Sequence, residues 1–386
     1  MKQCRRITLW IMCLTLLSSS TGCWNYGEVD KLSTVAGIAI DKGEDDKIVL
    51  TVELVDPTGG NDSMHTGSQL ITLTGYTIFD IVRRIITESG TKLYWAHAKS
   101  LIMSEEIARS GAAKVIDWYI RDTETRSDIH VLISGEKTAK EILDSKEKVS
   151  DPLSYRIEDI LKNEKNVSAS PVMELWDFVD TINTPGISSI LPVIYLKDNN
   201  GRETASINGL AVFDMDRMLG KMDYLQTKYV LMLRNELEGG VVALGGYDRP
   251  PGISLEIFSN KTKVKPVIVD GEVQIQVQTH TVMAVDEVLQ KVDFYTEKGR
   301  VEVEELAEDT MEAEMMKVIQ YAQQKYKQDV FGFGRIIHER MPKQWKGLEA
   351  DWDERFSQLK VTVESKVIIK NTASSIKPIL IEEDDK

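Results

Sequence analysis

The spacing of apolar residues predicts a chain in which helices and strands are mixed. The clearest helix begins after Thr77, whose hydroxyl can cap a helix N-terminus. Apolar residues then recur every three or four positions and share one stripe: Ile78, Ile81, Val82, Ile85 and Ile86. Strand-like runs surround this helix: Ser33–Ile40, Lys47–Val55, Gln69–Leu73 and Ile129–Ile133. Strand, helix and strand in this order predict an α/β layer.

More helices are predicted before residue 185. One follows Ser104 and runs to Ile120 with an interruption near Gly111, and three others are expected at Thr138–Ser145, at Leu153–Asn163 and from Ser170-Pro171 onward. Proline at the first position of a helix is favourable because its missing N–H is not needed there. The first half of the chain is therefore expected to contain several short helices around a sheet.

The second half is expected to be richer in strands. They are predicted at Ile190–Leu196, Ala205–Phe213, Ile253–Ile257, Thr262–Val269, Glu272–Met283 and Leu359–Ile369. Strict alternation of apolar and polar residues in Glu272–Met283 indicates a half-buried antiparallel strand. A long helix, roughly Glu302 to Gln328, is predicted with these residues near one face: Leu306, Ala313, Met316, Ile319, Ala322 and Tyr326.

These patterns predict an α+β protein: a mixed α/β, multi-domain chain of two to three domains, with mixed and antiparallel sheets and flanking helices. The turn Asp198-Asn199-Asn200-Gly201 is the best boundary candidate. We therefore predict a removable leader (1–22), an N-terminal α/β part (23–197), a C-terminal part with an antiparallel sheet and a long helix (198–374), and an acidic tail (375–386).

The first residues form a secretory leader. Basic residues at Lys2, Arg5 and Arg6 precede an apolar run, Ile7–Leu17, and a small-residue exit that ends on Cys23. The run is too short to span a bilayer, which needs about 20 apolar residues. Cys23 stands where a bacterial lipoprotein carries its diacylglyceryl thioether, although Ser20 occupies a position where leucine is usual. The alternative is a secreted protein in which Cys23 is incidental.

Composition agrees with an exported, membrane-tethered chain. Two of the three cysteines, Cys4 and Cys13, belong to the leader, so the mature chain keeps only Cys23 and no intramolecular disulfide can form. Removing the leader removes three basic residues and no acidic one, which takes the formal net charge from −14 to −17. Such a charge argues against nucleic-acid binding, which rewards clustered lysine and arginine.

Catalytic motifs are not found. The sequence has no phosphate-binding loop ending in Lys-Ser/Thr, no His-Glu-x-x-His and no Gly-x-Ser-x-Gly elbow, and its five histidines are scattered. Gly332-Phe333-Gly334 is interpreted as a sharp turn after the long helix. We therefore expect a non-enzyme without metal or cofactor, apart from the covalent lipid on Cys23.

An ordered set of short motifs runs through the chain. It includes Cys23-Trp24 with Glu28, Tyr94/His97/Lys99 before Glu105-Glu106, Arg121-Asp122 with Arg126, Gly209–Phe213, Gly220, Lys263–Pro266, Asp329–Gly334, Pro342, Trp345, Trp352 and Phe356. Together these motifs resemble the C-subunit lipoproteins of spore-germination nutrient receptors. The resemblance implies a non-catalytic subunit that acts with a multi-pass A subunit and a transporter-like B subunit. It also implies a lipid-anchored place on the outer face of the spore inner membrane.

Seven residues are candidates for a partner interface: Trp24, Glu28, His97, Arg121, Arg126, Trp345 and Trp352. Four of them have a structural alternative. The arginines could be neutralised by Asp122, Glu124 and Asp128, and the two later tryptophans could belong to the core. Two other functions stay open: a solute-binding lipoprotein of a transporter, which would have two similar lobes around a ligand cleft, and an extracytoplasmic hydrolase with an unmarked site.

Overall fold

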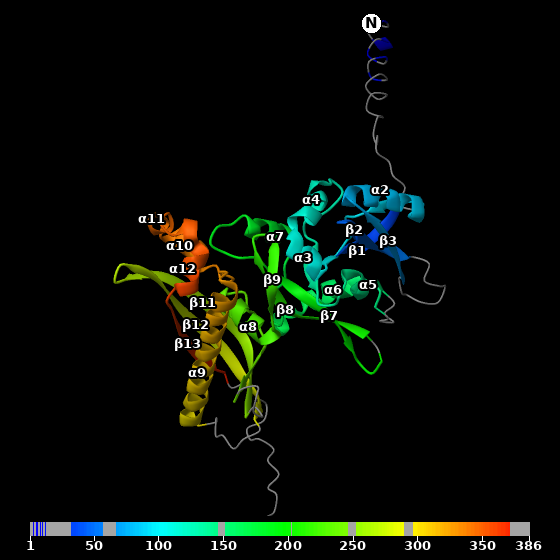
Figure 1. The fold of residues 1–386 in the computed structure, drawn as a ribbon. Coiled ribbons are helices and arrows are strands. Elements are labelled where there is room, and N and C mark those ends of the chain that lie inside the picture. Colours follow the sequence, from blue (N-terminus) through cyan, green and yellow to red (C-terminus); the bar gives the residue numbers. More distant parts are fainter. Residues whose placement is uncertain are drawn as a thin grey trace, which may run out of the picture.

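The computed structural model describes residues 32–56, 67–145, 151–201, 203–245, 252–288 and 296–370, together with six positions between residues 3 and 12. Helices and two mixed sheets make up the fold (Figure 1), which confirms the predicted α+β class. Cys23, Trp24, Glu28 and the acidic tail lie outside the described residues, so the predictions made for them stay predictions.

The first sheet contains parallel and antiparallel pairs in the order β3-β2-β1-β5-β6-β7-β8-β9, and β4 also pairs with β1. Its strands are β1 (Leu32–Lys42), β2 (Ile48–Asp56), β3 (Gly67–Gly75), β4 (Lys92–Tyr94), β5 (Ser100–Met103), β6 (His130–Ser134), β7 (Ile190–Asp198), β8 (Glu203–Asp214) and β9 (Arg217–Met222). The central pairs β1–β5, β5–β6 and β6–β7 are parallel. The outer strands on both sides pair antiparallel.

Helices cover both faces of this sheet (Figure 1). The helices packed on one face are α2 (Ile78–Ser89), α3 (Glu105–Gly111), α4 (Ala113–Arg121) and α7 (Leu175–Ile182), and those on the other are α5 (Ala139–Leu143) and α6 (Leu153–Lys162). Successive residues of a strand point to opposite faces. Ile38 and Ile40 therefore join the first group of helices, and Ala39 joins the second.

Local signals in the first half produce the expected helix ends. The Thr77 side chain accepts a hydrogen bond from the Asp80 N–H at 3.3 Å, and the apolar stripe of α2 is buried. The helix after Ser104 is interrupted where predicted, because Gly111 has φ +121° and separates α3 from α4. The helix predicted from Ser170-Pro171 is wrong. Glu164 accepts the Ala169 and Ser170 N–H groups, which holds this segment in a non-helical course until α7 begins at Leu175.

The second sheet has the order β10-β11-β12-β13, with β10 (Val241–Leu244), β11 (Ile253–Val269), β12 (Glu272–Val288) and β13 (Val361–Ile369). The two predicted strands at 253–257 and 262–269 are one continuous strand, β11. The antiparallel sheet predicted for the C-terminal part needs one correction: β10–β11 and β11–β12 are antiparallel, but β12 and β13 are parallel. The chain between them passes through several helices: α9 (Glu297–Tyr321), α10 (Phe333–Arg340), α11 (Pro342–Trp345) and α12 (Trp352–Gln358).

The long helix α9 lies beside the second sheet (Figure 1), and its predicted buried face is right only in its later part. Of the predicted residues, Ile319, Ala322 and Tyr326 are buried and Met316 is half-buried. Leu306 is 47% exposed and Ala313 is also exposed; the earlier part of the helix buries Gly299, Val303, Ala307, Met311 and Met315 instead. The earlier part was missed because polar residues also border the buried stripe, which weakens the helical periodicity in the sequence.

Three of these polar residues form a glutamate ladder along the edge strand β13. Glu304, Glu308 and Glu312 lie four residues apart on α9. They accept hydrogen bonds from the N–H groups of Ile369, Val367 and Ser365 at 2.8, 2.9 and 2.7 Å, respectively. Four helical residues rise about 6 Å, and two strand residues rise about 6.6 Å. The two repeats therefore match over this length, and the ladder occupies an edge that would otherwise be open to another strand.

The predicted boundary at residues 197/198 falls at the end of β7. β7 and β8 form an antiparallel pair whose register runs from Asp198↔Glu203 to Ile190↔Val212. The first sheet therefore continues through the boundary and takes β8 and β9 from the second half of the chain. The division into domains stays a prediction, and one core cluster includes residues from both sheets.

Candidate functional site

Several of the predicted interface residues lie at one edge of the first sheet. β1, β5 and β6 are parallel, so their N-terminal ends meet at the same edge. The loop before β5 carries His97, and the connection before β6 carries Arg121 and Arg126. β4 ties this region to the start of β1, because Lys92 pairs with Leu32 and also forms an ion pair with Glu124. We call Tyr94, His97, Arg121, Arg126 and Trp176 the edge surface.

The arginines of the edge surface are exposed and paired with acidic residues. Arg126 binds Asp128 at 2.6 Å, which is the predicted alternative partner, whereas Arg121 binds Asp117 at 2.6 Å, one turn earlier on α4. The hydrogen bond from Arg126 lowers the pKa of Asp128. Exposed ion pairs of this kind contribute about 0–1 kcal/mol, so a partner can exchange these contacts at little cost.

Aromatic side chains complete the edge surface. His97 is exposed and makes an edge-to-face contact with Tyr94, with ring centroids 5.5 Å apart. Trp176 was not among the predicted residues, yet its side chain is 52% exposed. Its backbone N–H donates to the carbonyl of Ser127 at 3.1 Å, which places it beside Arg126. A sequence signal existed: in α7, Leu175 and Phe178 form the buried stripe and Trp176 falls outside it.

Trp345 and Trp352 are placed in the core, which is the structural alternative. Only 2% and 7% of their surfaces are exposed, and their rings contact each other with centroids 5.3 Å apart. Trp345 also stacks on His338 at 5.6 Å. Neither side chain is available to a partner in this conformation, because the helices α10, α11 and α12 fold around them.

A buried carboxylate organises this helical cluster. Asp329 accepts hydrogen bonds from four backbone N–H groups and one indole: those of Phe331, Gly332, Phe333, Gly334 and Trp352. Burial raises the pKa of Asp329 to about 6, and the backbone N–H groups oppose that rise, so the group is ionised at neutral pH. Gly332 has φ +77° at the start of α10. The chain therefore turns at Gly332, as predicted, but Phe333 and Gly334 already belong to α10; Asp329 organises this helix start.

The two halves of the chain meet at a close backbone contact. A Cβ on Gly334 would lie 2.7 Å from the Cα of Gly186 and 2.6 Å from the Trp352 ring. Two backbone hydrogen bonds join the same segments, from Arg335 N to the Gly186 carbonyl and from Ser188 N to the Asp329 carbonyl, both at 2.8 Å. This contact fixes the loop that precedes β7 against the start of α10.

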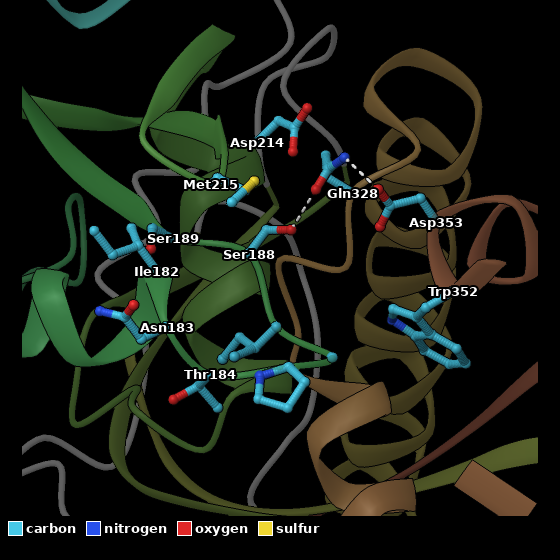
Figure 2. Close-up of a pocket in the computed structure, with 13 residues that line it drawn as sticks. Ile182, Asn183, Thr184, Ser188, Ser189, Asp214, Met215, Gln328, Trp352 and Asp353 are labelled. Carbon is cyan, nitrogen blue, oxygen red and sulfur yellow. Dashed lines mark hydrogen bonds between the residues drawn. The ribbon is translucent and has the colours of Figure 1, made fainter. Parts of the chain in front are cut away.

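A cleft of about 390 Å³ opens next to this contact (Figure 2). In it the Ser188 hydroxyl donates to Gln328 Oε1 at 2.7 Å, and Gln328 Nε2 donates to Asp353 Oδ2 at 3.1 Å. The pKa of Asp353 is raised by partial burial and by the charge of Asp214 across the cleft, while the bond from Gln328 lowers it. The carboxylates of Asp214 and Asp353 could receive small hydrogen-bond donors here.

The cleft does not have the parts of a hydrolase site. No histidine, lysine or cysteine lines it among the described residues, so its serine hydroxyls have no neighbouring imidazole to activate them. Over the same described ranges, no group of three or more His, Cys, Asp or Glu side chains is arranged to hold a metal ion. Hydrogen bonding across the junction is the chemistry that this cleft offers.

Comparison with known proteins identifies the class. A spore germination protein N-terminal domain matches residues 25–196, and a spore germination B3/GerAC-like C-terminal domain matches residues 208–373. The fold and these two matches define a spore germination protein. Because the matches cover most of the sequence, the chain belongs to the GerAC family, the germinant-receptor C-subunit family that its motifs resemble.

Full-length relatives support this assignment. Spore germination protein YndF of Bacillus subtilis (strain 168) is 25% identical over 93% of this chain and 95% of its own, and spore germination protein KC of the same organism is 22% identical over 97% and 98%. The crystal structure of the GerBC protein has the same fold, with a TM-score of 0.55 and 20% identity over 87% of this chain and 97% of that one. These names refer to germination and to no catalysed reaction.

Proposed function

We propose that this protein is a non-catalytic, lipid-anchored subunit of a spore germinant receptor. In this proposal it acts with a multi-pass A subunit and a transporter-like B subunit on the outer face of the spore inner membrane, where the complex triggers germination. The observation that carries the proposal is the coincidence of a lipoprotein leader with family membership over nearly the whole mature chain. Among the described residues, no helix has the length and apolar character needed to cross a bilayer.

The geometry suggests how the anchor would orient the protein. Leu32, the first residue of β1, is nine positions after Cys23, so the connecting chain spans at most about 32 Å. A lipid on Cys23 would therefore keep the start of β1, and the edge surface around it, close to the membrane. Exposed Trp176 together with mixed, weakly held ion pairs is suited to a protein partner, since Trp and Arg are enriched among interface residues that carry binding energy.

The anchor is tested by Cys23→Ala in the producing organism. We expect the protein to leave the membrane fraction and the germination response to fall, because a single thioether carries both lipid chains needed for stable attachment. Mass spectrometry of the wild-type N-terminus provides the direct readout. A free amino terminus without an acyl adduct, or full membrane retention of the variant, would refute the anchor.

The edge surface is tested by the double variant Arg121→Ala/Arg126→Ala, with Trp176→Ala as a separate variant. We expect less co-purification of the membrane subunits, with an unchanged melting temperature because all three side chains are exposed. The control is Lys343→Ala/Lys346→Ala, at α11 and the residue that follows it, which removes two exposed cations elsewhere. Complex recovery equal to wild type for both edge variants would refute this surface as the interface.

The alternative of a solute-binding lipoprotein is less well supported. It would have two similar lobes, whereas here a nine-stranded sheet with helices on both faces is joined to a four-stranded sheet of different order. The cleft at the junction nevertheless offers a defined place to look for ligand binding. Calorimetric titration of the isolated ectodomain with candidate nutrients is the experiment that separates the two functions.

A further inference from the structure

The second sheet has one strongly basic face. Lys261, Lys263 and Lys265 alternate along β11 with inward residues, so all three point to the same exposed side. Strand register then aligns basic side chains on three neighbouring strands, because Lys261 pairs with His280 on β12 and His280 pairs with Lys366 on β13. We call these five residues the basic face.

The basic face is unusual in a chain whose formal net charge is −14. Within the described part of the chain, no carboxylate forms an ion pair with Lys261, Lys263 or Lys265. Lys366 reaches across the edge strand to Glu308 at 3.0 Å, and Glu364 accepts a hydrogen bond from Gln278 at 3.0 Å. A hollow of about 530 Å³ lies beside this face, and its lining comprises Lys261, Lys263, Gln278, Thr279, His280, Glu364 and Lys366. The lysines of β11, which have no ion-pair partner among the described residues, and the hollow beside them together suit an anionic occupant.

The chain itself supplies a suitable anion nearby. β13 ends at Ile369, and Lys370 N donates to the carbonyl of Met283 at 2.8 Å, so Lys370 is held against β12 in the second sheet. That segment contains four consecutive acidic residues, Glu382 to Asp385. Lys366 lies in register with His280 and Lys261 and is three residues before Ile369, a distance of about 10 Å along β13.

The connecting length is sufficient. Eleven residues separate Lys370 from Glu382. They can extend to about 35–40 Å, and as a flexible chain they have a root-mean-square span of roughly 20 Å. The connecting segment is therefore long enough for the acidic residues to reach the basic face without strain. A short tether of this kind gives an effective concentration of the order of millimolar, which makes several individually weak charge contacts effective together.

We propose that the basic face binds the acidic segment Glu382–Asp385 of the same chain. In this arrangement the carboxylates of the segment neutralise the lysines of β11. Because the contacts are between exposed charges, added salt weakens them. The inference rests on charge and chain geometry in the second sheet and does not require the lipid anchor.

The first test is zero-length carbodiimide cross-linking of the purified chain from residue 24 to 386, which keeps every element from β1 onward. An equal mixture of ¹⁵N-labelled and unlabelled protein is cross-linked in about 50 mM salt and analysed by mass spectrometry. We expect Lys261 or Lys263 to join Glu382–Asp385 within one copy, and the yield to fall at least about fivefold in 0.5 M salt. Cross-links only between copies, or none to this segment, would overturn the proposal.

The second test uses His280 as a reporter at the centre of the basic face. The variant Glu382→Gln/Glu383→Gln/Asp384→Asn/Asp385→Asn should shift the His280 imidazole resonance and speed modification of Lys261 and Lys263 by an amine-reactive probe at least twofold. The matched control neutralises four exposed acidic residues that lie outside the second sheet and α9: Glu44, Glu88, Glu141 and Glu349. An unchanged His280 resonance and unchanged lysine reactivity in the first variant would refute intramolecular binding.

Discussion

The glutamate ladder leads to a sharp prediction about the edge strand β13. Replacing Glu304, Glu308 and Glu312 together by alanine removes the acceptors of three backbone N–H groups, those of Ile369, Val367 and Ser365. Only 17% of the side-chain surface of Glu304 and of Glu308 is exposed, so these bonds are partly shielded from water. The variant would leave β13 with an unpaired edge.

The expected loss of stability can be estimated bond by bond. A hydrogen bond typically contributes about 0.5–1.5 kcal/mol net, and one to a charged group about 1.5–3 kcal/mol. Water can reach the freed N–H groups of an edge strand, so we take about 1 kcal/mol for each. Alanine favours a helix over glutamate by a few tenths of a kcal/mol at each position. The free energy of unfolding should therefore fall by roughly 2–3 kcal/mol.

Two measurements check this estimate. Urea denaturation gives the change in the free energy of unfolding, and hydrogen exchange followed by NMR gives the protection of the individual amides. We expect the Ser365, Val367 and Ile369 amides to exchange roughly fivefold faster or more, since about 1 kcal/mol corresponds to that factor. The freed edge should also increase self-association, because open edges recruit other strands.

Matched variants separate the ladder from a general effect of charge. Glu302→Ala/Glu305→Ala/Asp309→Ala removes three carboxylates from the exposed side of the same helix and should leave β13 protection unchanged. Replacing the ladder residues by glutamine keeps a carbonyl acceptor and should recover most of the lost stability. If the ladder variant matched the exposed-side control in both measurements, the proposed role of the three carboxylates would be wrong.

Two further predictions concern the contacts between segments. Gly334→Ala places a methyl group 2.6–2.7 Å from Trp352 and Gly186. Overpacking of this kind should lower the free energy of unfolding by about 1–3 kcal/mol in a denaturation experiment, and an unchanged value would contradict the close contact. Burial raises the pKa of Glu164 to about 7, above its ordinary value of 4.5, so the folded state holds this proton more tightly than the unfolded state. The contribution of protonated Glu164 to the free energy of unfolding is therefore complete below about pH 4.5, and roughly 3 kcal/mol of it is lost as the pH rises to about 7. Glu164→Gln should flatten this pH dependence in urea denaturation. A pH profile identical to wild type would contradict this prediction.

Some features escaped sequence analysis because the signal was absent from the local pattern. α8 (Tyr224–Leu233) begins with a capping box formed by Asp223 and Gln226, yet it was not predicted as a helix. Every residue from Thr227 to Leu233 is buried, so the helix has no polar face and no 3.6-residue alternation to detect. Sequence periodicity reports a boundary between core and solvent, and α8 has none.

Other misses came from contacts between distant segments. Trp345 and Trp352 have the composition of interface anchors, but only the packing of α10 to α12 shows that their rings are enclosed. The reverse holds for Trp176, whose exposure depends on how α7 docks against β6. Local ion pairing was the structural alternative for Arg121 and Arg126. Arg126 pairs with Asp128, as that alternative stated, but Arg121 pairs with Asp117, one turn back on its own helix and not among the predicted partners.

By itself, the sequence determined the α+β class, the caps and stripes of individual helices, the leader ending at Cys23 as an expectation, and the resemblance that the family matches confirm. These depend on neighbouring residues or on ordered motifs, which a linear chain displays directly. Tertiary structure decided which cations share a face, which carboxylates occupy the edge of β13, and how one sheet runs through both halves. Those arrangements join residues up to about a hundred positions apart, and a pattern that repeats every two or four residues has no means of recording them.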